Sequence, residues 1–302
     1  MRKINIDKFI SVFGEQYNFP EIEKIKPVLK DTVHLYREPN ADENIPVGTS
    51  KFGGSPDLPK GMKYPYYSEE VAYSFIMQLD CSILKTYDKS NKLPKEGMLY
   101  LFHAYEYESI VLPFDVEGDL DAFLRSTHIF HYNGSMDNLE RTKLPNNEHI
   151  EVIESASISF VTGYTIPEPV WHEELYMELG FIKDHTNYVL NDFYKALPRL
   201  VFEKEEDVLN NDLYRFYDKP HHQILGTPTS YQGDPGYEVV VDHKNLFNIS
   251  TTQEEWILLF QIWDDDDIKL TWAAPGYMYY YIKKEDLTAG NWKDIYSVME
   301  CS

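Results

Sequence analysis

The feature that most constrains this sequence is a pattern of residues that occurs twice, once in each half of the chain. Each copy has a glycine-containing segment in which a small hydroxylic residue precedes a proline, then an apolar stretch interrupted by one glutamine, then a glycine-led aromatic stretch. The first copy comprises 51–56, 75–80 and 97–102, and the second comprises 223–228, 258–262 and 276–281. Composition alone does not produce so long an order. The repeat predicts one β-rich body made of two related halves.

The composition favours a mainly β fold of the α+β class, with an internal duplication and peripheral helices. Aromatic residues make up 15% of the chain and include 24 tyrosines, and such rings pack well on pleated surfaces. Segments that are rich in β-branched or aromatic residues and bounded by turn formers predict strands. These segments are 33–37, 71–80, 97–107, 126–132, 155–164, 238–242, 256–263 and 276–283.

Helical patterns lie near the start, in the middle and at the end of the chain. Apolar spacing predicts helices at 7–14, 20–30, 171–179 and 188–197, and a helical or turn segment at 285–295. We expect the central helices to mark the boundary between the halves. The chain then divides into residues 1–165, with the first repeat, and residues 166–302, with the helical seam and the second repeat, packed as one compact body.

The chain is strongly acidic, with 50 Asp and Glu against 28 Lys and Arg and a formal net charge of -22. Solubility is the simplest interpretation of this charge. An acidic surface also repels phosphate backbones, which disfavours nucleic-acid binding and favours a basic protein partner. The two cysteines, Cys81 and Cys301, are too few for a disulfide framework, and no apolar run is long enough for a membrane span. We therefore expect a cytoplasmic protein without a membrane partner.

The glutamines that interrupt the apolar stretches, Gln78 and Gln261, are the most interesting polar residues. A buried amide left without partners costs about 1–3 kcal/mol, so each must be hydrogen-bonded. Each amide can hold the backbone of the glycine-proline segment in its own half. Alternatively, both line a shared ligand pocket together with Lys51, His222 and Gln223. The histidine has the same two interpretations, as a structural residue that holds a turn or as part of that pocket.

The run of aspartates at 264–267 is the obvious candidate for a metal site, because hard cations prefer carboxylate oxygens. An EF-hand loop that began there would need a glycine and a glutamate where this chain has Lys269 and Pro275. We expect a solvated turn without a metal ion, with weak calcium binding through Asp264 and Asp266 as the alternative. No cofactor is predicted.

No motif with a known reaction mechanism stands out, so no residue is assigned as catalytic. The segment 172–176 begins like a helical zinc-protease signature, but Tyr176 replaces the second histidine. The glycine that a nucleophile elbow needs after Ser55 is replaced by Asp57, and no phosphate-binding glycine loop occurs.

The sequence resembles the YwqG-like family of uncharacterised bacterial proteins, which carries a domain of unknown function. The first similar stretch is 50–61, followed by Tyr64-Pro65 where the family usually has Trp-Pro. Further similar stretches are 222–226 with Pro228 and Gln232, then 256–264 and 276–287. The chain departs from the family at 272–276, where the family tends to place Gly-Asp before the glycine.

The resemblance implies a β roll with an internal duplication. It also implies a role as an immunity or accessory protein, because family members occur near genes for secreted toxins. Our leading hypothesis is a non-enzymatic binding protein that captures a basic toxin. The alternative is an enzyme or small-molecule binder with a cleft between the two repeats.

Overall fold

The computed structural model describes residues 20–106, 109–112, 115–116, 118–167, 172–179, 222–272 and 275–301. Its main strands are β1 (Lys30–Pro39), β2 (Lys51–Phe52), β4 (Ser74–Asp80), β5 (Met98–His103), β8 (Thr127–Tyr132), β10 (Ala156–Thr165), β11 (His222–Ile224), β12 (Trp256–Trp263), β13 (Gly276–Lys283) and β14 (Ile295–Cys301). They form one 10-stranded antiparallel sheet in the order β14-β13-β12-β11-β1-β10-β2-β4-β5-β8. The predicted mainly β fold is confirmed.

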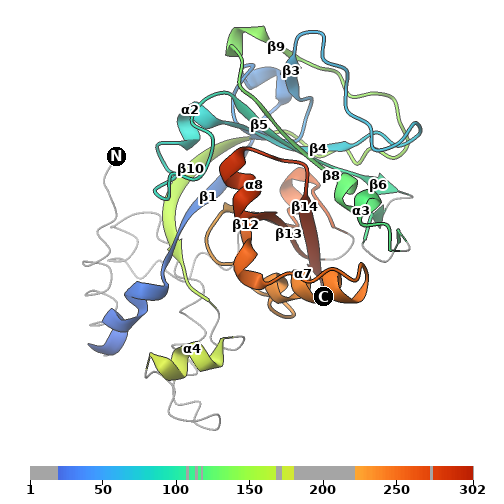
Figure 1. Ribbon diagram of the computed structural model, residues 1–302. Coiled ribbons are helices and arrows are strands. Elements are labelled where there is room, and N and C mark those ends of the chain that lie inside the picture. The colour runs from blue at the N-terminus through green and yellow to red at the C-terminus, as the bar shows by residue number, and fades with distance from the viewer. Residues whose placement is uncertain are drawn as a thin grey trace.

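The sheet curls nearly into a barrel, and its edge strands β8 and β14 contact each other (Figure 1). Short ribbons add β3 (Asp57–Pro59) with β9 (Leu139–Arg141), and β6 (Tyr105–Glu106) with β7 (Ser109–Ile110). The helices lie around the sheet: α2 (Cys81–Leu84), α3 (Leu120–Ser126), α4 (Glu173–Glu178), α7 (Pro235–Asn245) and α8 (Lys284–Ala289). Short 3-10 helices are η1 (Pro20–Val28), η2 (Asp42–Asn44), η3 (Met136–Asn138), η6 (Gln253–Glu255) and η7 (Asp266–Ile268).

The strand order is symmetric about the central pair, β1 and β10. Outward from β1 lie β11, β12, β13 and β14, and outward from β10 lie β2, β4, β5 and β8. Both copies also interrupt their register at the same point before the glutamine, between Phe75 and Met77 in the first and between Leu258 and Phe260 in the second. The two copies of the sequence repeat therefore adopt the same topology.

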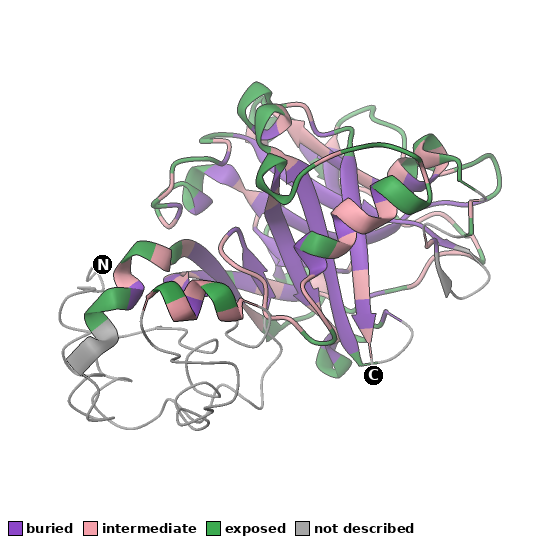
Figure 2. Cartoon of the chain, turned by 60° about the horizontal axis from the view of Figure 1, so that its bottom comes forward, coloured by how far each residue is buried: buried purple, intermediate pink, exposed green. Residues whose placement is uncertain are grey.

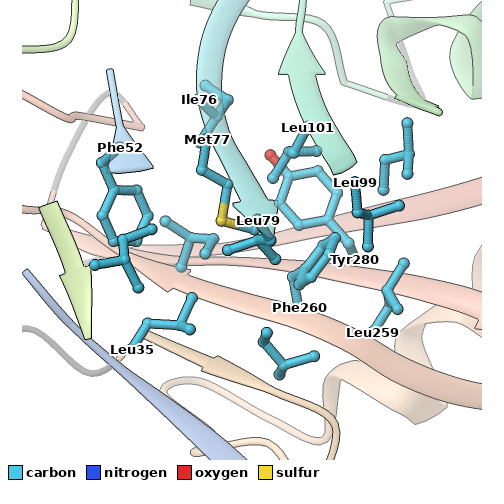
Figure 3. Close-up of a cluster of buried hydrophobic side chains, with 14 of the residues drawn as sticks. Leu35, Phe52, Ile76, Met77, Leu79, Leu99, Leu101, Leu259, Phe260 and Tyr280 are labelled. Atoms are coloured by element: carbon cyan, nitrogen blue, oxygen red, sulfur yellow. The ribbon is translucent and has the colours of Figure 1, made fainter. Parts of the chain in front are cut away.

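The strands are buried along most of their length (Figure 2), because apolar clusters cover both faces of the sheet. Side chains from both copies fill the interior, among them Phe52, Met77, Leu99, Phe260 and Tyr280 (Figure 3). A second cluster covers the outer face of the first copy and a third covers that of the second. Alternate residues of a strand thus face different apolar clusters.

Most of the predicted strands match the structure, but the strand predicted at 238–242 is wrong because that segment lies in helix α7. The Asp234 carboxylate caps the helix by accepting the backbone N–H of Gly236, and Pro235 stands in the first turn. These start signals outweigh the β-branched run that suggested a strand. The segment at 285–295 includes most of α8, and β14 follows it as a strand that the sequence patterns did not indicate.

The predicted helix at 20–30 is the 3-10 helix η1, and α4 occupies part of the predicted helix at 171–179. The helices predicted at 7–14 and 188–197 lie outside the described residues.

Strand β11 pairs with β1, so residues from both sides of position 165 share the sheet. The division at that position stays a prediction. None of the helices in the described ranges combines the length and the apolar character needed to cross a membrane.

Candidate functional site

In the first copy, the fully buried Gln78 holds the glycine-proline segment in place. Its amide oxygen accepts the backbone N–H of Asp57 at 2.8 Å. Its amide nitrogen donates to the Asp57 Oδ2 atom at 2.6 Å and to the carbonyl of Thr49 at 2.9 Å. The hydroxyl of Tyr100 donates to the carbonyl of Asp57. These contacts satisfy both ends of the amide within the fold.

In the second copy, Gln261 makes the matching contact. Its amide oxygen accepts the backbone N–H of Thr229 at 2.7 Å, and the hydroxyl of Tyr279 donates to the carbonyl of Thr229 at 2.7 Å. Thr229 thus takes the place of Asp57. The duplication extends from strand order to individual hydrogen bonds, and in both copies the observed contacts of the glutamine are those of a backbone support.

Lys51 and Gln223 are also equivalent, since each donates to the carbonyl four residues later. The Lys51 Nζ atom lies 2.5 Å from the Ser55 carbonyl oxygen, and the Gln223 Nε2 atom lies 2.9 Å from that of Thr227. Lys51 is fully buried and pairs with Asp42 at 2.5 Å. Burial lowers the pKa of Lys51, while the hydrogen bond and charge of Asp42 oppose that shift. The carboxylate of Asp42 thus compensates the positive charge of the buried Lys51 side chain.

Arg141 completes this charged network in the first copy. Its Nε atom lies 2.5 Å from Asp57 Oδ1 and its Nη1 atom lies 3.0 Å from Asp42 Oδ1. Asp57 Oδ2 also accepts the backbone N–H of Gly48 at 2.9 Å. Two cations and two carboxylates therefore neutralise one another under the glycine-proline segment, as buried charges require.

His222 lies in the barrel interior, where its ring centroid is 4.8 Å from that of Phe52. Its Nδ1 atom accepts the backbone N–H of Trp263 at 3.3 Å, which places the proton on Nε2, and Nε2 lies 3.3 Å from Asp265 Oδ2. Burial lowers the pKa of His222, more than the Asp265 carboxylate raises it. Because both ring nitrogens are engaged, no lone pair of this histidine is free to act as a base.

Asp265 links His222 to the first strand. Its Oδ1 atom lies 2.6 Å from Arg37 Nη2, and Arg37 Nη2 also lies 2.6 Å from Asp267 Oδ2. Burial alone would raise the pKa of Asp265, but hydrogen bonds from His222 and Arg37 outweigh it and hold that pKa at about 2. This cluster joins β1, β11 and the turn after β12.

The candidate pocket residues do not gather in one place. Lys51 pairs in register with Gln78, and Gln223 pairs with Gln261. Their strand neighbours point into the interior, so both pairs face outward, each toward the outer cluster of its own copy. His222 faces inward instead. A role for these residues in ligand binding stays a prediction.

A family model for a domain of unknown function matches residues 50–301. The chain belongs to the DUF1963 family, which is defined by a domain of unknown function. A search of curated proteins finds no match. The DUF1963 segment leaves out β1, although β1 lies at the centre of the sheet between β10 and β11. A strand that precedes the DUF1963 segment therefore completes its sheet.

The aspartate run of the DUF1963 domain is only partly a solvated turn. Asp264 Oδ1 accepts the backbone N–H of Trp272 at 2.9 Å, and Oδ2 accepts the hydroxyl of Thr271 at 3.2 Å. Burial raises the pKa of Asp264 to about 6. Asp266 is exposed, as expected of a turn. In the described part of the chain, no group of three or more His, Cys, Asp and Glu side chains could hold a metal ion.

The sequence patterns missed an acidic surface on the outer face of the second copy. We call it the α7 acidic row and define it as Asp234, which caps helix α7, Glu238 and Asp242 on the helix, and Glu300 on β14. Burial, followed by the charges of Asp242 and Glu300, raises the pKa of Glu238 to about 7. Reading 238–242 as a strand hid the four-residue spacing that places the helix carboxylates on one face. A row of carboxylates of this kind favours the binding of a positively charged group.

Proposed function

We propose that this DUF1963 protein is a YwqG-like cytoplasmic binding protein that captures a basic protein partner, in the manner of an immunity protein that neutralises a basic toxin. The observation that carries the proposal is the α7 acidic row. Within the described residues, no lysine or arginine forms an ion pair with its carboxylates. The basic side chain in contact with Asp234 is His172, whose Nε2 atom lies 3.8 Å from Asp234 Oδ2, and His243 and Lys244 lie in the last turn of α7. The row therefore holds negative charge that a partner can neutralise.

Electrostatics supports a basic partner over other ligands. The formal net charge of -22 speeds the approach of a positively charged protein and repels nucleic acid. Exposed aromatic side chains near the row offer contact area, with Tyr231 43% and Tyr237 61% exposed. Carboxylates arranged in this way can imitate the charge of a nucleic-acid substrate, which is the target of a nuclease-type basic toxin.

The proposed binding differs from the alternative of a cleft between the repeats. That alternative needs Lys51, Gln78, Gln223 and Gln261 to converge, whereas each pair supports the backbone of its own copy. The amide groups of the glutamines are used within the fold, whereas the carboxylates of the α7 acidic row are available to a partner.

The test is reconstitution of a defined complex. Proteins captured from an extract of the source organism at low salt are identified and purified, and each is titrated against the protein by calorimetry at increasing salt. We expect a stoichiometric complex with a basic protein whose affinity falls as salt rises. An unrelated protein of similar acidity serves as the control for non-specific attraction. Finding only partners that the control also binds, or a complex with a non-basic protein, contradicts the proposal.

A further inference from the structure

Helix α7 packs on the outer face of the sheet beside β14 (Figure 1). Its carboxylates Asp234, Glu238 and Asp242 recur every fourth residue, so they extend along one side of the helix for about 12 Å. The hydroxyl of Tyr296 on β14 donates to Asp242 Oδ2 at 3.1 Å, which fixes one end of the row against the sheet. Glu300 on the same strand lies toward the other end.

The carboxylates of the row differ in how far the fold uses them. Asp234 accepts the Nε2 of Gln253 at 2.6 Å besides capping the helix. Glu300 accepts the backbone N–H groups of Tyr231 at 2.7 Å and Gly233 at 2.8 Å. Its Oε2 atom also lies 2.8 Å from the Tyr279 hydroxyl, whose one proton it shares with the Thr229 carbonyl. These donors are neutral and hold the carboxylates in position without cancelling their charge.

Glu238 lies in the middle of the row and has no hydrogen-bond donor among the residues that the structure describes. Asp242 on its own helix and Glu300 on β14 both act on it with like charge. Removing a half-buried carboxylate from water without a donor is unfavourable. A cation at this point would restore the lost interactions.

Tyr281 on β13 provides a second and independent indication of a ligand. Its side chain is 4% exposed, and its hydroxyl is buried with no hydrogen-bond partner in the described ranges. Tyr281 pairs in register with Tyr296, whose hydroxyl binds Asp242, and both side chains lie in the apolar cluster on the outer face of the second copy, the face that carries the row. Burial and then the charges of Asp234, Glu300 and Glu238 raise the pKa of Tyr281 well above its ordinary value. A buried phenol is normally hydrogen-bonded, and leaving it unpaired costs about 1–3 kcal/mol. Within the described residues, the Tyr281 hydroxyl and the Glu238 carboxylate thus both lack a hydrogen-bond partner on this face.

We propose that the α7 acidic row and the hydroxyl of Tyr281 form a recognition site for the guanidinium or ammonium group of a basic side chain on the partner protein. This inference rests on the proposed function and locates its central contact. An elongated row of acceptors matches a group with several N–H donors better than a spherical ion, and the fork of a guanidinium matches carboxylates best.

Aromatic rings beside Glu300 suit the same ligand. The ring centroids of Trp263 and Tyr277 are 4.3 Å apart, and that of Tyr231 is 5.7 Å from Trp263. The backbone of Tyr231 binds Glu300, which places this exposed ring next to the row. Flat aromatic faces attract guanidinium and ammonium groups, so the rings extend the acceptor row into a surface for a basic segment.

Titration of Glu238 gives the site a pH dependence. The groups that face it are Asp242 on α7, Glu300 and Tyr296 on β14, and Tyr281 on β13, none of them cationic. A pKa of about 7 means that Glu238 is partly protonated at neutral pH. A cation binds the ionised form better, so affinity rises as the pH increases through 7 and falls as the pH decreases below it.

The experiment measures binding of a peptide of alternating arginine and glycine, with arginine amide and spermidine as free cations in separate arms. The variants are Glu238→Gln, which removes one charge with little change of shape, and Tyr281→Phe, which removes only the hydroxyl. The control is Glu254→Gln on η6, an exposed position outside the row with the same change of charge. We expect Glu238→Gln to weaken peptide binding about tenfold or more, Tyr281→Phe to weaken it several-fold, and Glu254→Gln to change it little.

Thermal unfolding of each variant separates lost binding from lost structure. Glu238→Gln removes like-charge repulsion and Tyr281→Phe removes an unpaired buried hydroxyl, so neither is expected to lower the melting temperature. Equal effects of Glu238→Gln and Glu254→Gln would show attraction by the whole surface and would overturn the site while leaving the proposed function intact. Binding of the free cations but not of the peptide would overturn a protein-borne ligand, and binding of no probe would overturn the site altogether. Absence of any basic protein partner in the capture experiment would instead refute the proposed function.

Discussion

At the residue scale, the two copies share hydrogen bonds even where their side chains differ. Lys51 in the first copy and Gln223 in the second donate to equivalent carbonyls, although one is charged and the other neutral. The charge of the lysine is balanced by Asp42, a partner from η2. The common requirement is therefore a donor for the carbonyl of the glycine-proline segment, and the charge is a local addition.

The glutamine of each copy can be tested by Gln78→Leu. This change leaves the N–H of Asp57 and the carbonyl of Thr49 without their partner in a buried site. We expect the free energy of unfolding to fall by about 2–3 kcal/mol, measured by urea denaturation. Gln261→Leu is the matched variant in the second copy and should also destabilise. Unchanged stability in either variant would contradict a supporting role for that glutamine and would favour the alternative that it lines a ligand pocket.

His103 predicts how stability depends on pH. This fully buried histidine packs against Tyr105, Trp272 and Tyr280, and burial lowers its pKa from 6.5 to about 3. The unfolded chain binds the proton as the pH falls through 6.5, whereas the folded chain does not, so this contribution to stability is present above pH 6.5 and is lost as the pH falls toward 3.

His103→Phe keeps an aromatic ring and removes the titration. We expect the stability of this variant to fall less steeply than that of the wild type between pH 6.5 and about 4, in urea denaturation at a series of pH values. Values at pH 8 give the loss caused by repacking alone, which is subtracted. An unchanged slope would mean that the histidine is already charged in the folded protein.

At the scale of elements, the glycine-proline segment turns through the left-handed region in both copies. Gly54 and Gly226 have φ of 66° and 84°, and Leu225 adopts 58° where the first copy has Gly53 at 52°. A Cβ atom on Gly226 would lie 2.5 Å from Thr165 Oγ1 and 2.9 Å from Thr32 Cβ. The turn thus brings the backbone against β1 and β10.

Gly226→Ala tests this close approach. We expect a loss of about 2–4 kcal/mol in unfolding free energy, combining left-handed backbone strain with the steric overlap. Gly61→Ala is the control, because its φ is 81° but a Cβ atom there meets nothing within 4 Å. The control should lose only about 1–2 kcal/mol. Equal losses at both positions would exclude the overlap as a cause.

Sequence patterns predicted elements best where periodicity and turn residues agree. The strands β12 and β13 match their predicted ranges at 256–263 and 276–283 because apolar aromatic runs end at clear turn formers. The strand predicted at 238–242 is wrong because the run of three valines is typical of a strand, whereas Asp234 and Pro235 start a helix just before it. The start signals of the helix are local, but they lie before the valine run and outweigh it, and the acidic row depends on that helix.

The candidate sites, too, could be predicted from the sequence only in part. The equivalence of Gln78 and Gln261 is visible in the sequence, because the repeat aligns them. Their partners are not visible, since the Asp57 and Thr229 backbones reach them only through turns that the fold creates. Tyr281 gave no signal either, because alternation along β13 shows only that it shares a face with Tyr279. Unpaired buried hydroxyls are found only in coordinates.

At the scale of the whole molecule, the two halves share one interior rather than two separate cores. Phe52, Met77 and Leu99 of the first copy pack with Phe260 and Tyr280 of the second. The join at the sheet centre is made by β1, which pairs with β10 on one side and with β11 on the other. Duplication has therefore produced halves that are similar in topology but dependent on each other for burial.

Separate expression of residues 1–165 and 166–302 tests this dependence. Each fragment would expose the interior face of its strands, so we expect neither fragment to unfold cooperatively. The full chain is expected to unfold in a single transition that far-UV and near-UV circular dichroism report alike. Mixing the fragments should restore near-UV signal, because the missing interior face is the other fragment. The full chain measured in parallel sets the reference signal. Two outcomes would contradict the dependence of the halves on each other: a fragment that unfolds cooperatively on its own, or two separate transitions in the full chain. Either outcome would show that a half has a sufficient core, so that the shared interior is a contact between independent domains.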